Sequence, residues 1–257
     1  MKAARRAARI WLPPLALIVL LVGLWQLAAS TGFLAGALDL EDFLVPSPAQ
    51  IAEVLWQDRS LIAENAEVTL IEIVAGFAVA LVLGVAVATA LHFSELLRRA
   101  SYPVVVASQT IPIIVIAPIL VVWFGFGIGP KLAVIALICF FPITVNTLDG
   151  LRSVDPDSVK MLRTLYAGRS QIFRRVEAPA ALPYLFSGAK IAVAVAVIGA
   201  VFGEWAGSDR GLGHLMLQDN AQLLTARMFA SVVVLSLIAI LLFGLIGLIE
   251  RALLRWR

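Results

Sequence analysis

Long apolar stretches, separated by short polar segments, are the feature that most restricts what this chain can fold into. Hydrophobic residues fill 61% of its 257 positions and charged residues only 14%, whereas an ordinary soluble domain carries about 25% charged residues. A soluble core of this size cannot hide so much apolar surface. Because about 20 mainly apolar residues cross a hydrocarbon layer as a helix, the sequence predicts an all-α membrane protein.

Apolar windows predict about six transmembrane helices. The windows lie near residues 11–30, 68–91, 103–124, 131–148, 188–205 and 229–249. The basic opening from Lys2 to Arg9 imitates a secretory signal peptide, but the apolar run behind it continues to about Ala29 without a convincing cleavage site. We therefore expect the first window to be a retained helix.

The distribution of basic residues predicts the orientation. With the N-terminus in the cytoplasm, sixteen of the 20 Lys and Arg residues face that side and four face the other, as the positive-inside rule requires. The inner set is Lys2, Arg5, Arg6, Arg9, Arg98, Arg99, Arg152, Lys160, Arg163, Arg169, Arg174, Arg175, Lys190, Arg251, Arg255 and Arg257, and the outer set is Arg59, Lys131, Arg210 and Arg227. An even number of crossings places both termini in the cytoplasm. The net charge of +3 then reflects membrane orientation, and no nucleic-acid partner is expected.

Residues 31–67 are predicted to lie on the outer side of the membrane. They begin with Gly-rich and acidic sequence and continue with Pro46-Ser47-Pro48 and a short amphipathic helix, which we expect to lie along the interface. No internal repeat is evident. We expect a single domain over residues 1–257, with its core helices over residues 68–249.

The longest predicted cytoplasmic loop runs from Asp149 to Ser187. Within it, Asp155-Pro156-Asp157 indicates a helix start, because Asp155 can cap free N–H groups and Pro156 suits the first helical position. Asp157 meets the positive end of the helix dipole. A short helix from Val159 to about Tyr166 is expected to follow.

The second half of this loop predicts another short helix. Ala167-Gly168 permits a break, residues 171–178 suit a helix, and Pro179 and Pro183 are expected to end it. Two short helices joined by a tight turn would form a rigid protrusion. The alternative is a merely basic loop near anionic lipid headgroups.

The sequence from Leu162 to Pro183 resembles the cytoplasmic coupling loop of permeases in binding-protein-dependent ABC importers, which sits in a groove on the ATPase subunit. The matching positions are Leu165, Ala167, Arg169, Phe173, Val176, Pro179, Ala180, Leu182, Pro183 and Gly188. The chain departs from the family at Lys160-Met161-Leu162, where Glu-Ala-Ala is usual, and at Tyr166, where glycine is usual. Gly168 is expected to take over the turn, since glycine has no steric penalty at positive φ.

The resemblance extends over nearly the whole chain. Further segments that carry it are Pro46-Ser47-Pro48, Gln109 to Pro112, Trp123 to Gly127 and Phe141 to Thr147. It is most similar to the branch that contains nitrate, sulfonate, taurine and thiamine-precursor permeases. Residues 146–155 and 197–205 look closest to pyrimidine-type thiamine-precursor permeases, with riboflavin-like solutes among the alternatives.

This resemblance implies a type I ABC importer permease-like bundle with cytoplasmic coupling helices, in the bacterial cytoplasmic membrane. It also implies ATP-binding subunits on the cytoplasmic face, an extracytoplasmic substrate-binding protein, and a second permease, which is either another copy of this chain or a close relative of it. ATP and Mg would be used by the ATPase partner, because this chain contains no Gly-x-x-x-x-Gly-Lys-Ser/Thr phosphate loop. No catalytic residue, cofactor or metal ligand is expected in the chain itself.

Polar and charged positions near or within the predicted helices are candidates for the solute path. They are Gln109, Thr110, Asn146, Glu204, Trp205 and Glu72. Inserting a charged side chain at the centre of a membrane helix costs about 2.5 to 3.5 kcal/mol of free energy, so such groups usually face a protein interior or water. Two alternatives remain open: the glutamates are solvated at the outer headgroup boundary, or the polar residues simply join helices. The outer segment from Gly207 to His214 is a candidate outer gate or docking surface for a binding protein.

Two other classes of protein remain open. A hydrolase would use Ser208 or Ser187 with a histidine base, but neither serine lies in a Gly-x-Ser-x-Gly frame, and His92 is predicted on the wrong side for Ser208. An ATP-independent carrier would not need a structured cytoplasmic protrusion. Carriers also often show two similar halves, which are not evident here.

Overall fold

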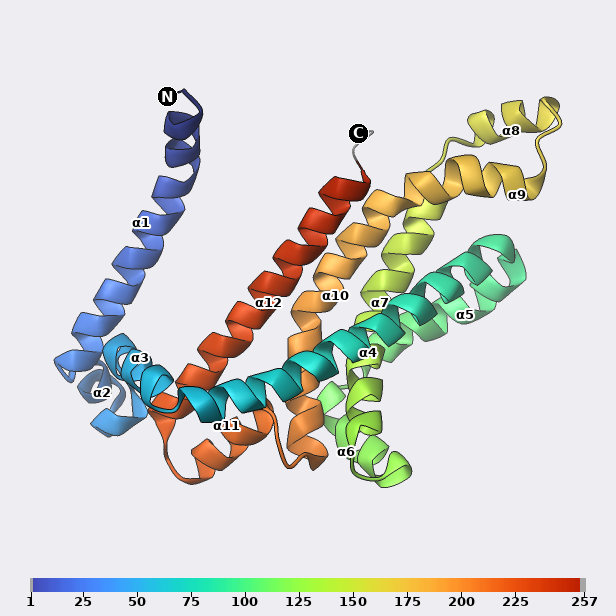
Figure 1. Cartoon of the computed structure of the whole chain (residues 1–257). Coiled ribbons are helices and arrows are strands. Elements are labelled where there is room, and N and C mark those ends of the chain that lie inside the picture. The colour runs from blue at the N-terminus through green and yellow to red at the C-terminus, as the bar shows by residue number, and fades with distance from the viewer. Residues whose placement is uncertain (1, 255–257) are drawn as a thin grey trace. The chain divides into compact units, whose positions relative to one another are not determined.

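The computed structural model describes residues 2–254 and consists of helices joined by short turns, with no strand in that range. Figure 1 shows their succession along the chain. The helices are α1 (Lys2–Ser30), α2 (Phe33–Leu38), α3 (Pro48–Gln57), α4 (Arg59–Phe93), α5 (Glu95–Ala107), α6 (Ile113–Phe124), α7 (Ile128–Arg152), α8 (Pro156–Thr164), α9 (Arg169–Ile172), α10 (Ala178–Gly207), α11 (Leu212–Ala221) and α12 (Thr225–Leu253), with 3-10 turns η1 (Asp42–Leu44) and η2 (Ser108–Thr110) and a π-helical turn η3 (Phe173–Glu177). The all-α prediction is confirmed.

Five segments are long and apolar enough to cross a membrane. They are Leu12–Ser30 of α1, α4, α7, the segment Arg169–Gly207 and α12. A sixth candidate is the pair formed by Glu95–Thr110 and Ile113–Phe124, which is bent by 101° at its break. About six crossings are therefore confirmed by length and composition. Two of the basic residues used to predict the orientation, Arg255 and Arg257, lie outside the described residues.

The window at residues 103–124 was expected to be one continuous helix, but the structure divides it into two helical pieces. Pro112 has no N–H to donate, and a proline disfavours helical geometry in the residue before it. Ile111 accordingly adopts an extended conformation, with φ −84° and ψ 120°. The chain leaves α5 through η2, turns at Ile111 and Pro112, and restarts as α6.

The helix expected near residues 68–91 begins earlier, because α4 already starts at Arg59. The placement of residues 31–67 on the outer side stays a prediction. The short helix after Pro46-Ser47-Pro48 is confirmed as α3. It begins with a capping box: the Gln50 N–H donates to Ser47 Oγ (3.3 Å) and the Ser47 N–H donates to Gln50 Oε1 (2.8 Å).

The chain groups into two compact units by its internal contacts. One comprises the residues up to Glu64 together with Leu215–Val234, and the other comprises Asn65–His214 together with the residues from Leu235 onward. The expectation of a single domain stays a prediction.

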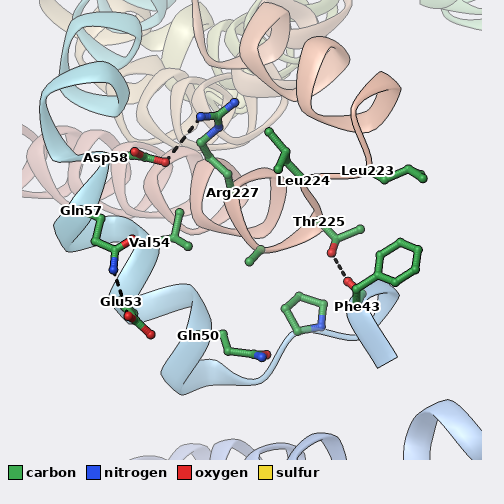
Figure 2. Close-up of a pocket in the computed structure, with 12 residues that line it drawn as sticks. Phe43, Gln50, Glu53, Val54, Gln57, Asp58, Leu223, Leu224, Thr225 and Arg227 are labelled. Carbon is green, nitrogen blue, oxygen red and sulfur yellow. Dashed lines mark hydrogen bonds and ion pairs between the residues drawn. The ribbon is translucent and has the colours of Figure 1, made fainter. Parts of the chain in front are cut away.

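The first unit joins α1 and α3 to the start of α12. The rings of Trp25 and Phe229 lie 6.2 Å apart, and the Ala49 N–H donates to Gln26 Oε1 (2.9 Å). This unit contains a pocket with a volume of about 410 Å³. Figure 2 shows its lining residues, among which the Thr225 hydroxyl donates to the Phe43 carbonyl. Arg227 lines this pocket and pairs with Asp58, at 3.5 Å.

The second unit is built on α7 and α10, which pack closely along their lengths (Figure 1). Small residues allow this approach, as is usual between membrane helices. A Cβ atom added at Gly188 would lie 2.6 Å from the Pro142 carbonyl oxygen, and one added at Gly199 would lie 3.2 Å from Ile135 Cα. The pair carries the predicted cytoplasmic loop at one end and the segment 208–214 at the other.

Candidate functional site

The predicted cytoplasmic loop contains the two expected helices. Asp155 caps α8, since its carboxylate accepts from the Asp157 N–H (3.0 Å) and from the Ser158 hydroxyl (3.3 Å). Pro156 occupies the start of the helix, as predicted. The helix α8 ends at Thr164 and α9 begins at Arg169, so the break falls close to Ala167-Gly168.

The expected end of the second helix is wrong. Pro179 and Pro183 lie inside a continuous helical segment, in which α9 passes through η3 into α10. Pro179 falls in the first turn of α10, where the missing N–H is tolerated. The π-helical turn at Phe173–Glu177, a conformation often found at functional sites, lies directly before it and also contains Val176.

Tyr166, and not Gly168, provides the left-handed residue of the turn between α8 and α9. Its φ is +59°, whereas Gly168 has φ −70° and ψ 158°. The Ala167 N–H donates to the Leu162 carbonyl (3.0 Å) and the Tyr166 N–H donates to the Arg163 carbonyl (3.0 Å). These two bonds form a complete Schellman motif, in which the left-handed position is normally occupied by glycine.

Three apolar side chains project from this turn. Met161, Leu165 and Tyr166 are all exposed, and Tyr166 retains 97% of its accessible surface. We call these three residues the tip. An exposed apolar cluster on a loop outside the spans is the kind of surface that marks a protein contact.

The base of the loop is attached to the end of α4 by a group of residues that we call the anchor. It comprises Arg169, Phe173 and Glu177 of the loop and His92 and Phe93 of α4. Glu177 is only 4% exposed and accepts from His92 Nε2 (2.9 Å) and from Arg169 Nη1 (3.3 Å). The Phe93 and Phe173 rings lie 5.0 Å apart, and the Arg169 guanidinium lies 5.1 Å from the centre of the Phe93 ring.

The sequence analysis identified Arg169 and Phe173 but missed their partners His92 and Glu177. Both missed residues have a sequence feature that could have indicated them. Glu177 is the only acidic residue between Asp157 and Glu204, within a strongly basic stretch, and His92 ends the apolar run of α4. A lone acid among basic residues needs a specific reason to be there, and a buried ion pair is the common one.

The two glutamates proposed for the solute path are buried in a network at the opposite end of α10. Glu72 forms an ion pair with Lys131, which also donates to Ser208 Oγ (3.0 Å). Glu204 has no exposed surface and accepts from the Thr69 hydroxyl (2.6 Å) and from the N–H groups of Gly213 (2.5 Å) and His214 (3.3 Å). Both carboxylates are therefore enclosed by protein and not solvated at a boundary.

This network fixes the segment 208–214 to the helices beneath it. The Leu212 N–H donates to Thr69 Oγ1 (2.8 Å) and the Gly211 N–H donates to Asn65 Oδ1 (2.7 Å). Gly211 has φ +117°, and a Cβ atom there would lie 2.3 Å from Glu204 Cδ, so only glycine fits. The Ser208 hydroxyl donates to the Arg210 carbonyl (2.5 Å), which uses the proton that a catalytic histidine would have to remove.

The remaining path candidates lie in three places. Gln109 and Thr110 are exposed at the break between α5 and α6, where Gln109 lines a hollow of about 220 Å³. The Asn146 side chain donates to the Pro142 carbonyl of its own helix (2.8 Å), and Trp205 Nε1 donates to the Gly213 carbonyl (2.8 Å). The structure thus brings Glu204 and Trp205 together with the outer segment and leaves Asn146 apart from them.

Comparison with known families decides what these features belong to. Residues 80–255 match the family described as the inner membrane component of binding-protein-dependent transport systems. The chain belongs to this family.

Full-length relatives of this permease agree with the family match. It is 40% identical over 247 residues, covering 96% of both chains, to the formylaminopyrimidine transport permease protein of Halalkalibacterium halodurans. It is 38% identical to the riboflavin transport system permease protein of Chloroflexus aurantiacus, over 95% of this chain and 89% of the relative. The chain is therefore an ABC importer permease subunit of the inner membrane, a transport component rather than a catalytic enzyme.

The fold of the permease also matches solved structures. A methionine ABC transporter in an inward-facing conformation superposes with a TM-score of 0.67 at 22% sequence identity, covering 78% of this chain and 97% of that chain. The type I importer permease fold expected from the sequence is confirmed. The anchor, the tip and Glu204 lie within residues 80–255 of the family match, whereas Glu72 and Thr69 precede it.

Proposed function

We propose that this permease imports a thiamine pyrimidine precursor, delivered by an extracytoplasmic binding protein and driven by ATP. The observation that carries the proposal is the 40% identity, across 96% of both chains, to a permease named for formylaminopyrimidine transport. A riboflavin-like solute is the second candidate, because the riboflavin relative is 38% identical. Aliphatic sulfonates and taurine follow, since relatives with those names are 27% identical, and nitrate is a further alternative.

The tip is the proposed contact with the ATP-binding subunit, which hydrolyses ATP with Mg on the cytoplasmic side. Its exposed apolar side chains support this role, because burying them against a partner would recover the free energy that exposure costs. The anchor supports it too. The buried Glu177 carboxylate holds the base of the loop against α4. A displacement of the tip can therefore be transmitted to α4 and α10, because the loop does not detach from them.

The break between α5 and α6 is the proposed place where a second copy of the chain completes the path. Irregular backbone at membrane depth is tolerated only where it is buried in protein or lines a water-filled cavity. Gln109 and Thr110 are exposed at this break and would otherwise face lipid. In the resulting homodimer, the termini and the coupling loop lie in the cytoplasm and the segment 208–214 faces the binding protein.

Transport by reconstituted vesicles tests the function. Liposomes would contain the permease with its ATP-binding subunits, with the binding protein outside and ATP inside. Radiolabelled formylaminopyrimidine, riboflavin and taurine are then compared in parallel. We expect uptake of the pyrimidine only, and only when both ATP and the binding protein are supplied.

The possible failures of this experiment separate the solute from the mechanism. Uptake of riboflavin instead of the pyrimidine would overturn the solute and leave the class of transporter in place. Uptake that continues after the ATP-binding subunits are omitted would overturn the mechanism, because it would show an ATP-independent carrier.

A further inference from the structure

An arginine-lined hollow lies between the first turns of α5 and the last turn of α7, and its lining contains no residue of the tip, the anchor or the buried network. Its volume is about 270 Å³. Its lining includes Arg98, Arg99, Tyr102, Leu148, Asp149 and Arg152. None of these residues has a role in the function proposed above.

The lining is electropositive and keeps unused hydrogen-bond donors. Its three arginines outnumber the single carboxylate of Asp149. Glu95, at the start of α5, accepts from Arg98 Nη2 (2.8 Å) and Arg99 Nε (3.0 Å). Each guanidinium has five N–H donors, so one shared carboxylate leaves most of them available. The Arg152 side chain makes no hydrogen bond or ion pair with any residue that the structure describes.

The hollow lies at the end of a candidate membrane span. The apolar span of α7 ends at Arg152, and α5 begins one turn before Arg98. The floor is apolar, because Leu148 packs with Ala88 and Leu91. Exposed apolar side chains continue from the hollow along α5, and the most exposed of them are Leu96 and Val104.

We propose that this hollow binds the phosphate of an anionic phospholipid, with the acyl chains lying along the exposed apolar side chains of α5. Guanidinium groups bind phosphate oxygens in a two-pronged geometry that lysine does not provide. Basic pockets between transmembrane helices on the cytoplasmic side are suited to anionic headgroups. The apolar surface that leads away from the arginines favours a lipid over a free phosphate ion, which would leave that surface unused.

Native mass spectrometry of permease released from nanodiscs tests this site. Nanodiscs contain phosphatidylcholine with an equal share of phosphatidylglycerol, and the number of phosphatidylglycerol molecules that remain bound is counted. The double variant R98Q/R152Q should bind phosphatidylglycerol roughly 25-fold more weakly, at about fivefold for each arginine near the surface. R98K/R152K should keep an intermediate affinity, because the charge stays and the two-pronged geometry is lost. R163Q, an exposed arginine of α8, is the matched control and should bind like the parent protein.

Several results would overturn the proposal. One is equal phosphatidylglycerol retention by the parent and R98Q/R152Q, and another is equal retention of both lipids by the parent. Thermal stabilisation by inorganic phosphate in lipid-free detergent, lost in R98Q/R152Q, would assign the site to a free anion. Unchanged lipid binding with weaker binding of the ATP-binding subunits would assign it to a protein contact. If R98Q/R152Q does not fold, R98K/R152K against R163Q decides between these outcomes.

Discussion

Tyr166 holds a left-handed conformation that costs a non-glycine residue about 1 to 2 kcal/mol, and its ring contacts almost nothing in its own chain. Strain of this kind persists where the surrounding structure imposes it, often at a functional position. Here the Schellman bonds at the end of α8 impose it. The ring is thus held out from the loop by a backbone that would be more stable with glycine.

Replacing Tyr166 with glycine should separate stability from partner binding. In Y166G the Ala167 amide, bonded to the Leu162 carbonyl, should exchange its hydrogen more slowly because the strain is removed. Binding of the ATP-binding subunits should weaken about tenfold or more, the equivalent of one lost aromatic burial. Y166F, which keeps the ring, should match the parent in both measurements. Normal affinity in Y166G would show that the ring does not contact the partner.

Some residue-level features of the loop could be predicted from the sequence and others could not. Asp155 was predicted as a cap because Asp-Pro-Asp has a local meaning that does not depend on the rest of the fold. The role of Tyr166 could not be predicted, because it depends on α8 ending at Thr164, and helix ends are poorly specified by local sequence. Glycine looked like the natural residue for the turn, so Gly168 was chosen instead.

At the scale of helices, two features matter most: the anchor, which holds the coupling loop, and the broken pair α5–α6, where we propose the solute path. The anchor depends on the π-helical turn, which was not predicted from the sequence. Glu177 lies at the end of this turn and contacts His92. The broken pair depends on Pro112, and the bend of 101° at this break was not predicted from the sequence. Tertiary packing decides whether a proline kinks a helix or breaks it.

Reversing the charge of Arg169 should uncouple ATP hydrolysis from uptake. R169E places a carboxylate beside buried Glu177 and should cost about 2 kcal/mol, the low end for such a pair, because the Arg169 side chain is 43% exposed. Uptake per ATP hydrolysed should fall while membrane insertion is unchanged. The double variant R169E/E177R should recover part of the coupling. If it recovers none, Arg169 acts through the ATP-binding subunit and not through the anchor.

Cysteine labelling can test whether the break faces water. The native Cys139 is fully buried, so the background should be low. In Q109C, a water-soluble maleimide should react in assembled transporter, and the reaction should slow when solute and binding protein are present. V82C, at an exposed position in the middle of α4, is the control that should stay unlabelled. Equal labelling of the two positions would contradict a water-lined path at Gln109.

At the scale of the whole molecule, composition and charge were the most informative properties of the sequence. They predicted the helical membrane fold and about six crossings, because the requirement to satisfy every backbone group inside lipid leaves few alternatives. The start of α4 was placed too late, since its first residues are polar and only packing shows that they are helical. The buried network of Glu72 and Glu204 also could not be predicted from the sequence. It joins residues more than 130 positions apart, as in the hydrogen bond from Thr69 to Glu204.

Assembly with a binding protein can be tested at the outer segment. Asp209 and Arg210 are exposed, and their backbone is held by the bonds of Gly211 and Leu212 to α4. R210E should lower the affinity for the binding protein several-fold, with a strong dependence on salt, because an exposed charge at an interface rim acts mainly through long-range attraction. If R210E changes neither the affinity nor transport, the segment is an ordinary turn that does not contact the binding protein.

The helix α10 is 30 residues long, so it spans about 45 Å at 1.5 Å per residue. The anchor residue Glu177 directly precedes its first residue, and Glu204 lies near its last residue. A tilt of about 5° over such a length displaces one end relative to the other by about 4 Å. In the proposed mechanism, we therefore expect a motion imposed on the coupling loop to reach the outer segment mechanically, without any relay of side-chain rearrangements between them.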